Sequence, residues 1–122
     1  MTSRPGAAAM LVLVIAALHG PAAQAHATLK QSAPADGAVL ARAPTEVSIT
    51  FNEALEKLFS GAVLRDRAGS LVGNAKAALD PANPAVLRLA VPPLKPGRYV
   101  VKWTAVGHDG HRQHGAIRFS VR

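Results

Sequence analysis

The chain has 122 residues, with 14 lysines and arginines, 7 aspartates and glutamates, 5 histidines and no cysteine. This length allows one small domain with a single hydrophobic core. The absence of cysteine excludes a disulfide-stabilised scaffold and every thiolate metal site, including the blue-copper centre of electron-transfer proteins.

The first 25 residues have the pattern of a secretory signal peptide. Arg4 supplies a positive charge, residues 7–18 are almost wholly apolar, and Ala23-Gln24-Ala25 forms a small-residue cleavage site. The apolar run is shorter than the roughly 20 residues that cross a bilayer, although an uncleaved anchor remains the alternative. We therefore predict a signal peptide over 1–25 and an exported domain over 26–122, with His26 as its first residue.

The predicted mature chain carries 13 basic and 7 acidic residues, a net charge of +6. A positive charge attracts nucleic acids and anionic membranes. The basic residues are scattered along the sequence, however, and no aromatic series accompanies them as single-strand binding requires. We interpret the charge mainly as a source of solubility, predict no nucleic-acid partner, and keep membrane proximity as a weaker alternative.

Short apolar segments separated by turn signals predict an all-β domain. Val47, Ile49 and Phe51 alternate with polar residues, as in a half-buried strand. Other strands are expected over 27–32, 61–65, 71–72, 86–91, 97–104 and 116–121, and residues 54–59 are expected to form a helical turn or a loop with buried Leu and Phe. About seven short strands without a long amphipathic helix favour a small β-sandwich or Greek-key barrel.

Three of the five histidines fall within residues 107–115, just after the only tryptophan. In an extended chain, Asp109 and His111 would point to the same side, and Gly110 between them would permit an unusual φ. By the same parity His108 and His114 would point away, so we expect each to be an exposed residue or one that supports a ligand. The competing interpretation is a loop of ordinary surface histidines.

A histidine at the amino terminus offers a metal ion both its α-amine and its imidazole. The ordinary pKa of an α-amine is about 7.7–8.0, so a metal displaces its proton readily near neutral pH. Two nitrogens from His26, one from His111 and an oxygen from Asp109 would give an N₃O set, which suits copper(II). Zinc would require a tetrahedral arrangement. Glu53 is expected either beside this site as a hydrogen-bond acceptor or on the solvated surface.

Several segments, in this order, resemble CopC-type periplasmic copper-binding proteins. The matching pieces are residues 26–29, 32–38, 43–44, 49–53 and 94–99, followed by Trp103, Asp109-Gly110-His111 and Gly115. The resemblance implies a cupredoxin-like or immunoglobulin-like β-barrel that binds one copper(II) per chain through His26, Asp109 and His111, with Glu53 near the site. Some relatives also bind copper(I) through methionines, and the predicted mature chain has none.

The leading hypothesis is a copper-binding protein that is not an enzyme. It would sequester copper, confer resistance or deliver the ion to a membrane partner such as a CopD-type transporter. A lytic monooxygenase is the second hypothesis, because such enzymes also use an amino-terminal histidine chelate, but an Asp ligand and a small domain with few aromatic residues disfavour it. A metal-free immunoglobulin-like interaction module is the third.

Overall fold

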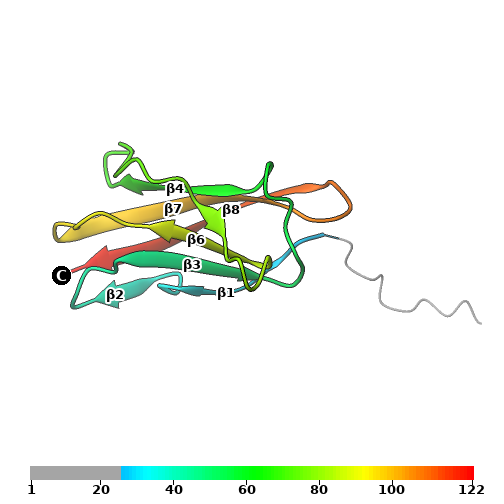
Figure 1. Ribbon diagram of the computed structural model, residues 1–122. Helices are drawn as coiled ribbons and strands as arrows, with labels where there is room; N and C mark the ends of the chain where they lie inside the picture. Colours follow the sequence, from blue (N-terminus) through cyan, green and yellow to red (C-terminus); the bar gives the residue numbers. More distant parts are fainter. Residues whose placement is uncertain (1–25) are drawn as a thin grey trace, which may run out of the picture.

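The computed structural model describes residues 26–122, which form a β-sandwich of two four-stranded sheets (Figure 1). The strands are β1 (Leu29–Ala33), β2 (Ala38–Leu40), β3 (Glu46–Phe51), β4 (Gly61–Asp66), β5 (Ala78–Leu79), β6 (Val86–Ala90), β7 (Gly97–Val106) and β8 (Arg112–Val121). The predicted signal peptide lies outside the described residues. Among residues 26–122, no helix is long and apolar enough to cross a membrane.

The first sheet has the strand order β1-β3-β6-β5 and the second has the order β2-β8-β7-β4. All pairings are antiparallel except that of β2 with β8. The longest pairing joins β7 and β8 from Gly97 opposite Val121 to Val106 opposite Arg112. This continuous ladder makes the β7–β8 hairpin the most extended element of the molecule.

Period-two alternation places the apolar side chains of both sheets between them. Val47, Ile49 and Phe51 of β3 are at most 2% exposed, and Val101, Trp103 and Ala105 of β7 are at most 8% exposed. Phe51 and Trp103 meet edge to face with ring centroids 5.0 Å apart, a favoured geometry for aromatic pairs. This contact joins the two sheets near the end that carries the histidine hairpin.

The structure confirms the predicted sandwich but has eight strands where about seven were expected. The short strands β2 and β5 were missed because three and two residues are too few to show a period. Residues 71–72 make only an isolated bridge, between Leu71 and Arg65.

The segment 54–59 is a turn rather than a helix. Leu55 is buried as expected, but Phe59 is 59% exposed, so the prediction of a buried Phe was wrong. The final strand also begins at Arg112 rather than at 116, because β8 keeps pairing with β7 up to the turn.

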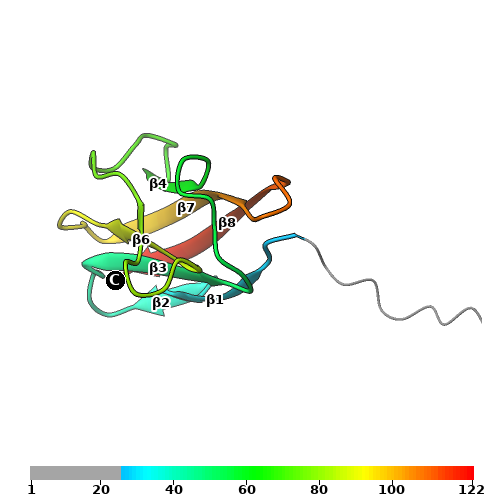
Figure 2. The same cartoon turned by 45° about the vertical axis from the view of Figure 1, so that its right-hand side comes forward.

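Two distant segments lie at the same end of the sandwich. The tip of the β7–β8 hairpin, drawn in orange, and the start of the described chain, drawn in blue, both lie at the right in Figure 1, whereas the carboxyl terminus lies at the left. Figure 2 shows the same arrangement after rotation. The fold therefore brings residues 26–28 toward residues 107–111.

The packing of Trp103 on β8 requires a glycine opposite it. Gly115 is the register partner of Trp103, and a Cβ at Gly115 would collide with the indole ring. Replacement Gly115→Ala should therefore displace the tryptophan and lower the free energy of unfolding by about 1–3 kcal/mol, as overpacked cores do. Urea denaturation would measure the change.

The matched control is Gly61→Ala in β4 of the same sheet, where an added Cβ would meet nothing within 4 Å. This variant should be neutral or slightly stabilised, because alanine reduces the entropy of the unfolded chain. Equal destabilisation of both variants would contradict the assigned packing.

Candidate metal site

A tight turn at the tip of the β7–β8 hairpin presents two of the predicted ligands. The Gly110 amide donates to the Gly107 carbonyl at 3.1 Å, and Gly110 has a φ of 76°, which favours glycine. Oδ1 of Asp109 accepts the His111 amide at 3.1 Å. Asp109 and His111 thus meet through a turn and a local side-chain bond. The extended-strand parity used to predict their approach was wrong, although the unusual φ of Gly110 is confirmed.

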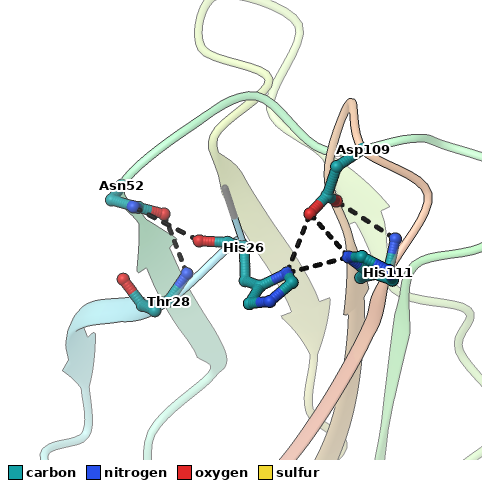
Figure 3. Close-up of polar contacts among 5 residues, drawn as sticks. All are labelled: His26, Thr28, Asn52, Asp109 and His111. Carbon is teal, nitrogen blue, oxygen red and sulfur yellow. Dashed lines mark hydrogen bonds and ion pairs between the residues drawn. The ribbon is translucent and has the colours of Figure 1, made fainter. Parts of the chain in front are cut away.

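The opposite side of the site comes from the start of the domain. Ala27 is fully buried, which anchors the segment in the core. Oδ1 of Asn52, just after β3, accepts the Thr28 amide at 2.8 Å, and the Asn52 amide donates to the Thr28 carbonyl at 3.0 Å. Nδ2 of Asn52 makes a longer 3.5 Å contact with the His26 carbonyl. These bonds hold His26 against the hairpin (Figure 3).

Three side chains converge between these two segments (Figure 3). Nδ1 of His26 lies 2.8 Å from Oδ2 of Asp109, and Nδ1 of His111 lies 2.9 Å from the same oxygen. The two ring nitrogens are 3.1 Å apart. Each of the three residues offers one potential ligand atom, and these atoms all lie within 4.8 Å of one another. The structure therefore brings together all three predicted ligands, from positions up to 85 residues apart.

Hydrogen bonds alone do not satisfy this triangle of atoms. An ionised carboxylate only accepts, and a neutral imidazole carries one N–H and one lone pair. If both Nδ1 atoms are protonated and donate to Oδ2 of Asp109, their two N–H groups also point at each other and repel. If one Nδ1 is unprotonated, its lone pair points at the carboxylate oxygen and is repelled by it. One cation bound by all three atoms would remove this conflict, so the donor set fits a metal ion.

The electrostatics of Asp109 keep its carboxyl group ionised. Removal from water, with the side chain only 19% exposed, would by itself raise the pKa of Asp109. Hydrogen bonds from the His111 amide and from the rings of His111 and His26 outweigh this effect and hold the pKa of Asp109 below its ordinary value. The oxygen shared by the two histidines is therefore an anionic ligand atom over a wide pH range.

Glu53 lies just behind this cluster and is half-buried, which excludes the solvated surface position. Its Oε1 is fully buried and has no hydrogen-bond partner among the described residues. The atom packs against Gly107 so closely that a Cβ at Gly107 would collide with it, and Ala27 adjoins the same spot. A buried, unpaired carboxylate oxygen is costly, which points to a missing donor or cation nearby.

The other two histidines lie apart from the cluster. His108 is exposed in the turn, with Nδ1 3.8 Å from Oε1 of Glu56. His114 is exposed on β8, with Nδ1 3.3 Å from Oγ1 of Thr104. Asn52 and Gly107 position the two halves of the site, and neither was predicted to have a role. The only signal was their place, one just after a strand and one at the start of the hairpin.

Comparisons with known proteins identify the family of the chain. The profile of the CopC domain family matches residues 29–122. Copper resistance protein C of Pseudomonas syringae pv. tomato is 35% identical over 122 residues, covering 95% of this chain and 90% of the relative. The copper transport protein CutJ of Bacillus subtilis is 32% identical over 98 residues, which make up 80% of this chain but 18% of CutJ.

A solved structure extends the likeness to the fold. The crystal structure of PcoC, a methionine-rich copper resistance protein from Escherichia coli, matches with a TM-score of 0.71 and 35% identity, covering 80% of this chain and all of PcoC. Unlike that methionine-rich protein, this chain has methionine only at Met1 and Met10.

The names of these relatives refer to copper resistance and copper transport. From the match over 29–122, the extended identity and the shared sandwich, the chain belongs to the CopC family of copper-binding resistance proteins, which are not enzymes.

Proposed function

We propose that the processed protein, beginning at His26, binds one copper(II) ion in the periplasm through His26, Asp109 and His111. His26 would supply its α-amine and its ring nitrogen, His111 a ring nitrogen and Asp109 a carboxylate oxygen. The bound ion would be sequestered, as a basis of copper resistance, or delivered to a membrane partner.

The observation that carries this proposal is the triangle formed by Nδ1 of His26, Nδ1 of His111 and Oδ2 of Asp109. Its three edges measure 2.8, 2.9 and 3.1 Å. His111 lies in the same turn as Asp109, but His26 is 83 residues away in the sequence, so the fold is what brings the second ring to the same carboxylate oxygen.

The nature of the donors favours copper(II). Imidazole and amine nitrogens with one carboxylate oxygen suit a tetragonal copper(II) centre, and the Irving–Williams order places copper above zinc. The described domain contains no sulfur ligand, since its sequence has neither cysteine nor methionine. Copper(I), which prefers thiolate and thioether ligands, is therefore a poor match for this domain.

Glu53 supports the site without contacting the ion in our proposal. Its buried oxygen adjoins Ala27, the residue after His26. A freed α-amine at His26 or a nearby cation would provide the donor or charge that this oxygen lacks. Residues that support metal ligands typically change metal affinity by about 10–100-fold when mutated.

The name of one relative supports a copper transporter as the proposed partner. The matched region makes up only 18% of CutJ, which is named a copper transport protein, so a domain of this type occurs within a much longer transport protein. We propose that this chain delivers copper to a separate transporter of the CopD type, using the hairpin end where the ligands are accessible.

Copper titration of the processed protein tests the ligand assignment. Wild-type protein should bind one copper(II) tightly, whereas His26→Ala, His111→Ala or one extra residue before His26 should each weaken binding by more than the roughly 100-fold expected from a supporting residue. Glu53→Gln should fall within the 10–100-fold range. Isothermal titration gives affinity and stoichiometry, and electron paramagnetic resonance gives the nitrogen count.

His108→Ala and His114→Ala are the matched controls, because both histidines are exposed and lie outside the cluster. They should retain wild-type affinity. Tight binding that persists in His26→Ala and in the extended chain would refute the assigned ligands.

The lowered pKa of Asp109 predicts a specific acid dependence of the copper-free protein. Because the folded pKa lies below the unfolded value of about 3.9, the ionised carboxylate stabilises the fold above that value. This contribution should disappear as the pH falls through the folded pKa. The difference in unfolding free energy between wild type and Asp109→Asn should therefore shrink on acidification below about pH 4.

Carbon-detected NMR titration of the Asp109 carboxyl group tests the cause directly. The pKa of Asp109 should rise toward its ordinary value in His111→Ala, which loses the ring hydrogen bond but keeps the backbone amide. A wild-type carboxyl that titrates in the ordinary range would contradict the described hydrogen bonds.

A further inference from the structure

The outer face of the second sheet gathers basic residues that are far apart in the sequence. By strand alternation, Arg65 of β4, Arg98 and Lys102 of β7, and Arg118 of β8 all lie on the side facing away from the core. Arg67, in the turn after β4, adjoins them. The interpretation of these residues as scattered was therefore wrong, because strand pairing brings them to one face.

Four of these cations surround a single residue, Val100. Arg65 and Arg118 are its register partners on the two neighbouring strands. Arg98 and Lys102 precede and follow it by two positions on β7. Each of the four cations is thus about 5–7 Å from Val100 at Cβ, and diagonal pairs on neighbouring strands, such as Arg65 and Arg98, are about 7–8 Å apart. Like charges at this diagonal separation repel one another weakly.

Little neutralises this group of cations, which we call the basic face (Arg65, Arg67, Arg98, Lys102 and Arg118). None of the five forms a salt bridge within the described residues. The nearby carboxylates of Asp36 and Asp66 accept the backbone amides of Arg118 and Ser70, and within residues 26–122 neither pairs with a basic side chain, so the face keeps an excess of positive charge.

The other sheet shows the opposite arrangement. On β6, Arg88 contacts both Glu46 and Asp80 at 2.7 Å. The cation on the first sheet is therefore neutralised by two carboxylates, whereas those on the basic face repel one another without a paired anion.

The basic face also has a shallow cavity and exposed apolar side chains. A cavity of about 280 Å³ is lined by Arg67, Arg98, Lys102 and Arg118, with Val100 at its base. Val39 on β2 and Val63 on β4 lie on the same face and are 58% and 41% exposed. The guanidinium of Arg65 donates to the Gly69 carbonyl at 2.8 Å, a bond that leaves its charge without a paired anion in the described domain. The face thus combines cations that lack a paired anion with exposed aliphatic groups over three strands and the adjoining β2.

We propose that the basic face docks the protein on an anionic phospholipid surface, with lipid phosphates among the five cations. Charge complementarity carries the assignment: five cations lie in one surface without a paired anion, and lysines and arginines near an anionic bilayer each favour binding. The cations extend beyond the cavity, to Arg65 and alongside exposed valines. An array of lipid phosphates above a flat sheet matches this spread better than one small soluble anion does.

Docking in this way leaves the candidate metal site free. Val100 precedes Val106 by six residues on β7, so the centre of the basic face lies about 20 Å from the base of the hairpin turn at a strand rise of about 3.4 Å per residue. The ligand cluster would lie at the edge of the docked face, within lateral reach of a transporter in the same membrane. The lipid interaction uses different residues from copper binding and does not depend on it.

Vesicle sedimentation of the processed chain tests the proposal. The predicted signal peptide must be absent, since its apolar sequence would bind bilayers by itself. The protein should sediment with mixed phosphatidylglycerol–phosphatidylcholine vesicles and not with phosphatidylcholine alone, and added salt should weaken binding because exposed charges are screened. The triple variant Arg98→Gln, Lys102→Gln and Arg118→Gln should reduce partitioning roughly a hundredfold, at about fivefold per residue.

The matched control is Lys30→Gln, Arg42→Gln and Lys95→Gln, three exposed cations that share no cavity with the basic face, which removes the same net charge. This control should retain most of the binding. Equal losses in both triple variants would show that net charge alone attracts the protein and would overturn the proposal. Urea denaturation should show the basic-face variant to be at least as stable as wild type, because repulsion has been removed.

Two further arms separate other anions from lipid. Millimolar inorganic phosphate should not displace the protein from vesicles, and a single-stranded oligonucleotide should bind more weakly than the vesicles do. Displacement by phosphate or tighter oligonucleotide binding would each overturn the lipid assignment. Copper titration of both triple variants should match wild type, so a failure of lipid binding remains distinct from a failure of the copper proposal.

Discussion

The contact between Phe51 and Trp103 fixes the separation of the two parts of the candidate metal site. Phe51 ends β3, and the next residue, Asn52, binds the segment that carries His26. Trp103 lies on β7, three residues before the end of that strand, and the hairpin that follows carries Asp109 and His111. Edge-to-face packing of these two rings between the sheets sets the distance that the three side chains bridge. The packing of the core therefore also determines the geometry of the ligands.

Two glycines in the hairpin allow large or charged side chains to pack directly against its backbone. Gly115 leaves room for the indole of Trp103, and Gly107 leaves room for the carboxylate of Glu53. Each lies in the hairpin opposite a large or charged side chain, and each allows the hairpin to lie nearer the rest of the fold than a Cβ would. The buried oxygen of Glu53 then packs against Gly107, at the start of the hairpin that carries Asp109.

Much of this arrangement could be predicted from particular residues. The alternation at Val47, Ile49 and Phe51 predicted a half-buried strand, and the combination of His26 with Asp109 and His111 predicted the cluster. The strand-parity argument failed because Gly110 turns the chain, and a turn was not distinguished from extended chain by spacing alone. Asn52 escaped notice because its role depends on a backbone contact with Thr28, which no local pattern reveals. The grouping of Arg65, Arg98 and Arg118 likewise depends on strand register, which scattered positions in a sequence do not show.

The ligands come from opposite ends of the domain sequence, so the site can form only after most of the chain has been synthesised and folded. His26 is synthesised early and His111 85 residues later, so a partly made chain that stops before Asp109 lacks two of the three ligands. An unfolded chain holds the two imidazoles far apart on average, and a preformed site rarely exists before folding. Metal binding therefore follows folding. A misfolded or truncated molecule would not bind the ion, which would stay available to correctly folded molecules.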